Sequence, residues 1–194
     1  MEYSDLYKQT GMHCRFSPDG RYLSLAFQHR LVIRNAETIA VVEAFHTPYK
    51  AAPYINDVQW APTSDLVLTL CLAENKVNVW SVEDKEWRFE LQDEIAGIKA
   101  VRWAPDGRHL LVWSDFELRL TIWSLVSDQK VYIQYPRLTG KGVDFHPDGK
   151  LMAVAQRKDY RDYIGIYEAE SWSLIKVRTR RHVLPRRRAA TNRM

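Results

Sequence analysis

The chain has 194 residues, of which 46% are apolar and 27% charged, so we expect a sizeable core and no disorder in bulk. Its two cysteines, Cys14 and Cys71, are too few for a disulfide framework, and we expect two buried, reduced thiols. No signal-peptide pattern opens the sequence and no apolar run approaches membrane-spanning length, so we expect a cytoplasmic or nuclear protein without membrane contact.

A five-residue block occurs near the start of the chain and then recurs three times. It consists of an aromatic residue, a small residue or histidine, a proline and two turn-forming residues, and its copies are 16–20, 60–64, 103–107 and 145–149. The prolines are 44, 43 and 42 residues apart. Proline presets φ for a tight turn and glycine takes the left-handed position, so each block should join two strands. A period in the low forties is the length of one four-stranded propeller blade.

Segments with strand patterns flank every block. The residues before it alternate between polar and apolar, as in 56–60 and 99–103. Apolar runs follow at 22–27, 66–72, 109–113 and 151–155, then alternating runs at 31–35, 77–81, 120–124 and 164–168. Closing segments lie at 39–45, 87–91, 130–135 and 172–177. The sequence therefore predicts four units of four strands, at about 5–45, 52–92, 97–136 and 141–177, and no convincing helix.

Two features lie where WD-repeat propellers have them: the Ser-Pro-Asp-Gly turn at 17–20 and the Val-x-Val-Trp-Ser strand at 77–81. The chain resembles that family, which implies an all-β fold of WD40-type β-propeller blades. Four units are fewer than a WD-type ring normally closes, so we expect part of a larger or incomplete propeller. The family's strongest members have a Gly-His pair, absent here, and an Asp where this chain has Glu74 and Glu117. We expect these two glutamates to cap local backbone amides.

Segments 14–23, 30–34, 103–109 and 158–164 together match one branch of these propellers more closely. Over residues 5–177 the chain resembles the WRAP-type, or WD-repeat-eight, family of centrosome and spindle-pole proteins. The resemblance implies a place in the cytoplasm and cytoskeleton, with a nuclear fraction. It also implies two partners, a coiled-coil spindle-anchoring protein and, from fungal relatives, a minus-end-directed kinesin. Members of the family carry further repeats, so we expect a C-terminally shortened form.

The basic charge of the chain lies at its C-terminus. The net charge is +4 and the pI is about 9.0, yet residues 174–194 hold eight basic side chains and no acidic one, which leaves the rest mildly acidic. Segment 178–194 is predicted to be a disordered basic tail. Three interpretations of this tail compete. It is a by-product of a shortened or alternatively spliced gene model, a nuclear-import or nucleic-acid contact, or a contact with tubulin. Its candidate contact residues are Arg180, Arg181, Arg186, Arg187 and Arg188.

No arrangement in the sequence predicts an enzyme. It has no glycine-rich phosphate loop, no His-Glu-x-x-His, no Cys-x-x-Cys and no Gly-x-Ser-x-Gly. The acids Asp19, Asp106 and Asp148 precede the last turn residue, where aspartate is favoured for backbone reasons. We therefore predict no catalytic residue, no metal ligand and no cofactor.

Seven tryptophans offer candidate anchors for a protein interface. Four of them, Trp60, Trp80, Trp103 and Trp123, fall in the repeated motifs, so we expect them in the core. The less constrained Trp87, Trp113 and Trp172 are better candidates for interface anchors. The charged, tyrosine-rich segment 157–163 adds Tyr160 and Arg161 as candidate contacts.

The leading hypothesis is a non-enzymatic WD-repeat scaffold for protein–protein interactions in centrosome or spindle-pole assembly and microtubule anchoring. One alternative is an RNA-associated propeller of the translation-initiation-factor type, because the basic tail suits a polyanion. Another is a truncated product with no independent function, because an open array exposes strand edges and apolar faces.

Overall fold

The computed structural model describes residues 14–50, 54–127 and 129–179. These residues form sixteen strands and one short 3-10 turn, Asp115–Glu117. The strands make four sheets of four antiparallel strands each, in chain order within every sheet. The all-β prediction with four four-stranded units is confirmed. Within the described ranges, no helix has the length and apolar character needed to cross a membrane.

The strand bounds follow the repeated pattern. The first sheet holds β1 (Cys14–Phe16), β2 (Tyr22–Phe27), β3 (Arg30–Asn35) and β4 (Val41–His46). The second holds β5 (Asp57–Trp60), β6 (Leu66–Cys71), β7 (Lys76–Ser81) and β8 (Arg88–Gln92). The third holds β9 (Ala100–Trp103), β10 (His109–Trp113), β11 (Arg119–Ser124) and β12 (Lys130–Gln134). The fourth holds β13 (Val143–Phe145), β14 (Leu151–Lys158), β15 (Arg161–Glu168) and β16 (Leu174–Thr179).

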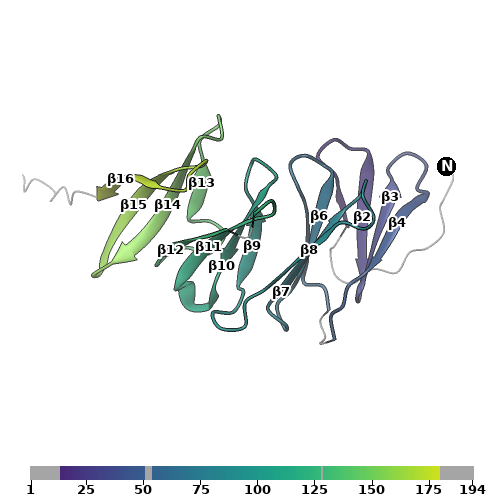
Figure 1. Ribbon diagram of the computed structural model, residues 1–194, viewed down its shortest axis with the longest axis horizontal. Helices are drawn as coiled ribbons and strands as arrows, with labels where there is room; N and C mark the ends of the chain where they lie inside the picture. Colours follow the sequence, from purple (N-terminus) through teal and green to yellow (C-terminus); the bar gives the residue numbers. More distant parts are fainter. Residues whose placement is uncertain (1–13, 51–53, 128, 180–194) are drawn as a thin grey trace, which may run out of the picture.

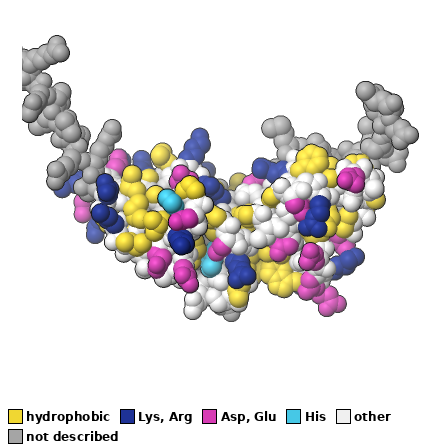
Figure 2. Space-filling model, turned by 90° about the horizontal axis from the view of Figure 1, so that it is seen from above, with side chains coloured by type: hydrophobic (Ala, Val, Ile, Leu, Met, Phe, Trp, Pro, Cys, Tyr) yellow, Lys and Arg dark blue, Asp and Glu magenta, His cyan; other side chains and the backbone are white. Residues whose placement is uncertain are grey.

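The four sheets stand in a row in chain order (Figure 1). Seen from above, the row bends into an arc (Figure 2). An apolar cluster lies between each pair of successive sheets, so the core consists of three layers rather than one centre. This is the expected organisation of a repeat array, in which each unit packs only on its neighbours.

The repeated block forms the turn between the first two strands of each sheet. Its last residue has positive φ in every copy, at 74° in Gly20, 67° in Gly107 and 73° in Gly149. Ser64 takes this position in the second sheet at φ 67°, which a side chain makes unfavourable. Its hydroxyl accepts a hydrogen bond from the backbone N–H of Asp19 at 3.1 Å. Ser64, the residue that replaces glycine in this turn, is therefore hydrogen-bonded to the equivalent turn of the first sheet.

The aromatic residue of each block packs on the preceding sheet. The indole N–H of Trp60 donates to the carbonyl oxygen of Arg15 at 3.0 Å and to the Ser24 hydroxyl at 3.1 Å. That of Trp103 donates to the carbonyl oxygen of Gln59 at 3.3 Å. Phe16 holds the same position in the first described sheet and is 64% exposed, against 8% for Trp60. The difference follows from the neighbour, because no described sheet precedes β1.

Two expectations from the sequence need correction, the burial of Cys14 and the start of the basic tail. Cys71 is buried, but Cys14 is exposed, since it lies two residues before Phe16 on the same open face of β1. Burial raises the pKa of the Cys71 thiol. Strand β16 runs to Thr179, so residues 178 and 179 belong to the fourth sheet and not to the tail.

The expectation that the two glutamates cap backbone amides is confirmed, but these amides are not local, since they lie 24 and 22 residues away. The Glu74 carboxylate accepts a hydrogen bond from the backbone N–H of Lys50. The Glu117 carboxylate accepts one from the backbone N–H of Thr139 at 3.1 Å. Glu74 thus joins the loop between β6 and β7 to the segment that leads into its own sheet, whereas Glu117 joins the loop between β10 and β11 to the segment that leads into the next sheet.

Candidate interaction site

Of the ten side chains proposed as contacts, five lie where the structure gives no description: Arg180, Arg181, Arg186, Arg187 and Arg188. The tail prediction for 180–194 likewise falls outside the described residues. The other five, Trp87, Trp113, Trp172, Tyr160 and Arg161, occupy very different environments.

The tryptophans are poor surface anchors. Trp113 is fully buried because it shares with Leu111 the face of β10 that packs against the fourth sheet, while the other face of β10 packs against the second sheet. Trp172 is also buried, and its ring meets those of His109 and Phe145 edge to face. The expectation that these two would be available to a partner is wrong. Trp87 is half-buried against the core between the second and third sheets.

The core prediction for the motif tryptophans is right for Trp60, Trp80 and Trp103, which are buried. Trp123 is only half-buried, and the ammonium group of Lys130 lies over its ring at 3.8 Å from the centroid. The Lys130 side chain, from the neighbouring strand β12, covers the part of the Trp123 ring that the core leaves exposed.

Tyr160 and Arg161 lie together in the hairpin between β14 and β15. Tyr160 is 100% exposed and has φ 62°, a conformation that a bulky residue seldom takes. Below the tip, Arg157 pairs with Asp162 through two bonds, Nε to Oδ1 at 2.6 Å and Nη2 to Oδ2 at 2.8 Å. Hydrogen bonding to this guanidinium lowers the pKa of Asp162. The bidentate pair holds the hairpin closed while Tyr160 projects into solvent.

The segment between β12 and β13 lies beside this hairpin. The backbone N–H of Arg157 donates to the carbonyl oxygen of Tyr135 at 3.1 Å, and that of Arg137 donates to the carbonyl oxygen of Ala155 at 2.7 Å. Pro136 forms an isolated bridge with Gln156. These bonds extend the β14 ladder beyond β13, so the segment is fixed although it is not a strand.

Glu117 connects this segment to the third sheet. Its carboxylate accepts bonds from the Thr139 backbone N–H at 3.1 Å, the Thr139 hydroxyl at 3.3 Å and the Arg137 guanidinium at 3.1 Å. Phe116 and Glu117 have φ values of 58° and 53°, and Phe116 is 92% exposed. An exposed aromatic ring on a strained backbone is costly unless the surroundings enforce it, and such positions cluster at functional sites.

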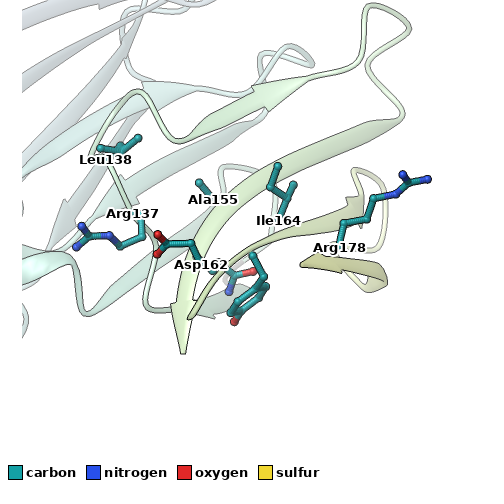
Figure 3. A pocket seen from close by; sticks show the side chains of 8 residues that line it. Arg137, Leu138, Ala155, Asp162, Ile164 and Arg178 are labelled. Carbon is teal, nitrogen blue, oxygen red and sulfur yellow. The ribbon is translucent and has the colours of Figure 1, made fainter. Parts of the chain in front are cut away.

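A pocket of about 470 Å³ opens on the fourth sheet, on the face turned away from the third sheet. Ala155, Ile164 and Arg178 stand in one cross-strand row on β14, β15 and β16. Leu138 comes from the segment before β13, and Figure 3 shows Arg137 and Arg178 on opposite sides of the pocket. The remaining lining residues are Gln156, Asp162 and Tyr163.

A close approach between side chains supports the wall of this pocket. The Tyr167 hydroxyl donates to Gln156 Oε1 at 2.9 Å, and Gln156 Nε2 donates to the carbonyl oxygen of Gln134 at 2.8 Å. A Cβ atom on Gly165 would lie 2.5 Å from Gln156 Oε1 and 2.7 Å from Tyr167 Cε2. Glycine is therefore required there, because any side chain would displace this buried pair.

A larger hollow of about 920 Å³ lies at the turns of the third and fourth sheets and is lined in part by Pro105, Phe145, Pro147 and Trp172. Two more hollows lie near the pocket or on the opposite side of the array. A smaller one of about 180 Å³ adjoins the pocket through Arg137 and is lined also by Phe116, Glu117, Tyr135, Pro136 and Arg157. The other follows the repeated turns of the first three sheets and is lined by Arg15, Phe16, Pro18, Gln59, Trp60, Pro62, Arg102, Trp103 and Pro105. We call the pocket, the smaller hollow and the hairpin tip of Tyr160 and Arg161 the loop platform.

The charges on the loop platform are unequal. Glu117 and Asp162 are both engaged by arginines, at 3.1 Å and 2.6 Å. In the part of the chain that the structure describes, Lys158, Arg161 and Arg178 form no ion pair. Among the same described residues, the exposed Asp159 at the hairpin tip also forms no ion pair. The platform therefore presents apolar and aromatic side chains with three free positive charges and one free negative charge.

The described side chains offer no metal-binding chemistry. No group of three His, Cys, Asp or Glu side chains is close enough to hold a metal ion within residues 14–50, 54–127 and 129–179. His109 and His146 instead contact the turn aspartates Asp106 and Asp148 at 2.6 Å and 2.7 Å. Both pairs are local contacts of the repeated block.

Sequence comparison with known proteins identifies the relatives of the chain, although no family model matches it. It is 38% identical over 176 residues to the WD repeat-containing protein WRAP73 of Mus musculus. The chain is a WD-repeat protein related to WRAP73. The match covers 91% of this chain and 37% of WRAP73. An uncharacterized WD repeat-containing protein of Schizosaccharomyces pombe is 23% identical over 79% of this WD-repeat chain and 33% of its own length.

Solved structures place the WD-repeat chain in the β-propeller fold. The β-propeller domain of Myceliophteria thermophila Cps50 (Swd1) superimposes with a TM-score of 0.63 at 16% identity, over 91% of this chain and 57% of that domain. Hydrazine synthase of Kuenenia stuttgartiensis superimposes at 0.56 with 17% identity, over 93% of this chain and 53% of its own. Both comparisons concern the fold alone, since one fold hosts unrelated functions.

Proposed function

We propose that this WD-repeat protein is a non-enzymatic scaffold that presents the loop platform to protein partners in centrosome or spindle-pole assembly and microtubule anchoring. The observation that carries the proposal is the exposure of Phe116 and Tyr160 on loops that hydrogen bonds hold in place. A rigid, exposed aromatic side chain is the usual anchor of a protein interface, because little conformational entropy is lost when it binds.

The relation to WRAP73 supports a scaffold, because WD-repeat propellers are generally non-catalytic and bind proteins. By the same resemblance we propose a location in the cytoplasm and at the centrosome or spindle pole. The proposed partners are a coiled-coil spindle-anchoring protein and a minus-end-directed kinesin. We keep the division into four blades and a basic tail as part of this proposal, with the boundary moved from residue 177 to the end of β16 at Thr179.

Localisation of the tagged full chain through mitosis tests the proposal. The double variant Phe116→Ser/Tyr160→Ser removes both exposed rings. Ile95→Ser is the matched control, since Ile95 is an exposed apolar side chain in the loop between the second and third sheets. We expect pole enrichment of the wild type and of the control, and loss of enrichment in the double variant. A uniform cytosolic signal of the wild type in mitosis would overturn the proposal.

A further inference from the structure

We propose that the loop platform binds an acidic linear peptide segment of a partner protein, with a bulky apolar side chain seated in the pocket on the fourth sheet. This inference rests on the proposed function as a protein-binding scaffold and names the chemistry that the scaffold recognises. Three observations carry it: the lining of the pocket, the unpaired charge of Arg178 and the second hollow beside it.

The pocket suits an apolar side chain. Ile164 and Leu138 are large apolar residues that remain about half exposed, and Ala155 between them leaves the space open. The volume of about 470 Å³ lies within the range of protein sites that bury a ligand. Covering these side chains removes apolar surface from water, which supplies the main driving force for an occupant.

The unpaired charge of Arg178 selects the occupant's sign. The carboxylates of Glu117 and Asp162 already accept hydrogen bonds from Arg137 and Arg157. Arg178 lines the pocket without an ion pair among the described residues. Lys158 and Arg161 form another cross-strand pair of the same hairpin, and alternation places them on the face of the sheet opposite Ala155 and Ile164. An acidic segment would meet the unpaired Arg178 in the pocket, whereas a basic one would meet like charge.

The second hollow fits a chain that continues past the first site. It shares Arg137 with the pocket and adds the rings of Phe116 and Tyr135. Arg137 is held by Glu117 on one side and by the Ala155 carbonyl oxygen on the other, so the spacing between the two hollows is fixed. A linear peptide can place one side chain in the pocket and a later one in the second hollow.

An apolar pocket does not suit a nucleic acid, because phosphates need direct contact with cations and bases need flat stacking surfaces. The mixed lining of the pocket, apolar in its floor and basic only at its rim, favours a peptide. Nucleic acid and a second copy of the chain are therefore treated as outcomes of the test.

The test is a fluorescence-polarisation titration of the full chain against a labelled synthetic peptide in which leucines alternate with glutamates. Two control peptides replace the leucines with serines or the glutamates with lysines. We expect binding of the first peptide only. The variants Ile164→Asp and Arg178→Glu should each weaken it by about tenfold or more. Arg88→Glu is the matched control, since Arg88 is an exposed arginine of β8, the outermost strand of the second sheet.

Several results would overturn the inference. Equal binding of the lysine peptide would remove the charge argument, and unchanged binding by Arg178→Glu with a normal melting curve would remove the pocket. Displacement of the peptide by a single-stranded RNA at similar concentration would assign the platform to polyanions. A dimer that Ile164→Asp dissociates would assign the pocket to a second copy.

The two proposals fail in different ways. A chain that is enriched at the poles but binds no acidic leucine peptide loses only the inference about ligand chemistry. A chain that binds the peptide through Ile164 and Arg178 but is absent from the poles retains this site and loses the proposed place of action.

Discussion

Glu117 holds Thr139 in place through both hydrogen-bond donors of that residue, the backbone N–H at 3.1 Å and the hydroxyl at 3.3 Å. The two residues come from different sheets, the first from the turn between β10 and β11 and the second from the segment that leads to β13. This contact ties the two loops of the platform together. The first prediction follows from it.

Glu117→Ala should loosen the segment from 136 to 142 while leaving the sheets intact. The variant removes three accepted hydrogen bonds, and we expect a loss of about 1–2 kcal/mol in folding free energy. Hydrogen exchange of the backbone amides should accelerate in this segment. Glu94→Ala, an exposed acid of the preceding loop, serves as control. Unchanged exchange at Thr139 would contradict the assignment.

Gly165→Ala should destabilise the fourth sheet. The added Cβ would meet Gln156 Oε1 at 2.5 Å and Tyr167 Cε2 at 2.7 Å, and relief of such crowding costs about 1–3 kcal/mol. Urea unfolding measures the loss. Tyr167→Phe, which removes only the hydroxyl bond to Gln156, should cost about 1 kcal/mol. Equal stability of Gly165→Ala and the wild type would show that the pair moves aside freely.

The same substitution should have unequal effects at two equivalent repeat positions. Trp60→Ala should cost about 3–5 kcal/mol, because the ring is buried between the first two sheets. Phe16→Ala should cost only about 0.5 kcal/mol, because its ring is mostly exposed. Chemical denaturation of both variants gives the comparison. Similar losses would mean that the open face of β1 is covered in solution.

The pair of Arg157 and Asp162 should respond to pH at the acidic end. Arg157 lowers the pKa of Asp162 below its usual value of 3.8, so the stabilisation by this pair is complete above that pH and disappears as the pH falls through the lowered pKa. Arg157→Gln should return the pKa of Asp162 towards 3.8 in a carbonyl NMR titration. Asp148, whose pKa is lowered mainly by the backbone N–H of Lys150, should not move.

The fold could be predicted from the sequence because its determinants are local. Each turn depends on a proline and a residue at positive φ within five positions, and each strand on alternation over a few more. The same local reasoning identified Tyr160 and Arg161, since a charged, tyrosine-rich hairpin is exposed wherever its sheet lies. It could not identify the amides that Glu74 and Glu117 cap, because these lie 24 and 22 residues away.

The pocket could not be predicted, because it depends on contacts between distant segments. Arg137 and Leu138 reach β14 through backbone bonds such as that from Arg137 to Ala155, and the bond from Thr139 to Glu117 ties the same segment to the third sheet. Trp113 was misjudged although a signal existed: it ends the apolar run 109–113, and β10 is buried on both faces from Leu110 to Trp113. Phe116 carried a signal as well, as an aromatic residue between two acids in a short loop.

Hydrogen exchange of the full chain with and without the acidic leucine peptide tests the central claim most directly. If the loop platform is the interaction site, the peptide should slow exchange at the amides of 137–142 and 157–164 and leave the turns at Gly20, Ser64 and Gly107 unchanged. Protection of those turns, with no change around Arg137 and Ile164, would place recognition in the groove along the repeated blocks and contradict the account.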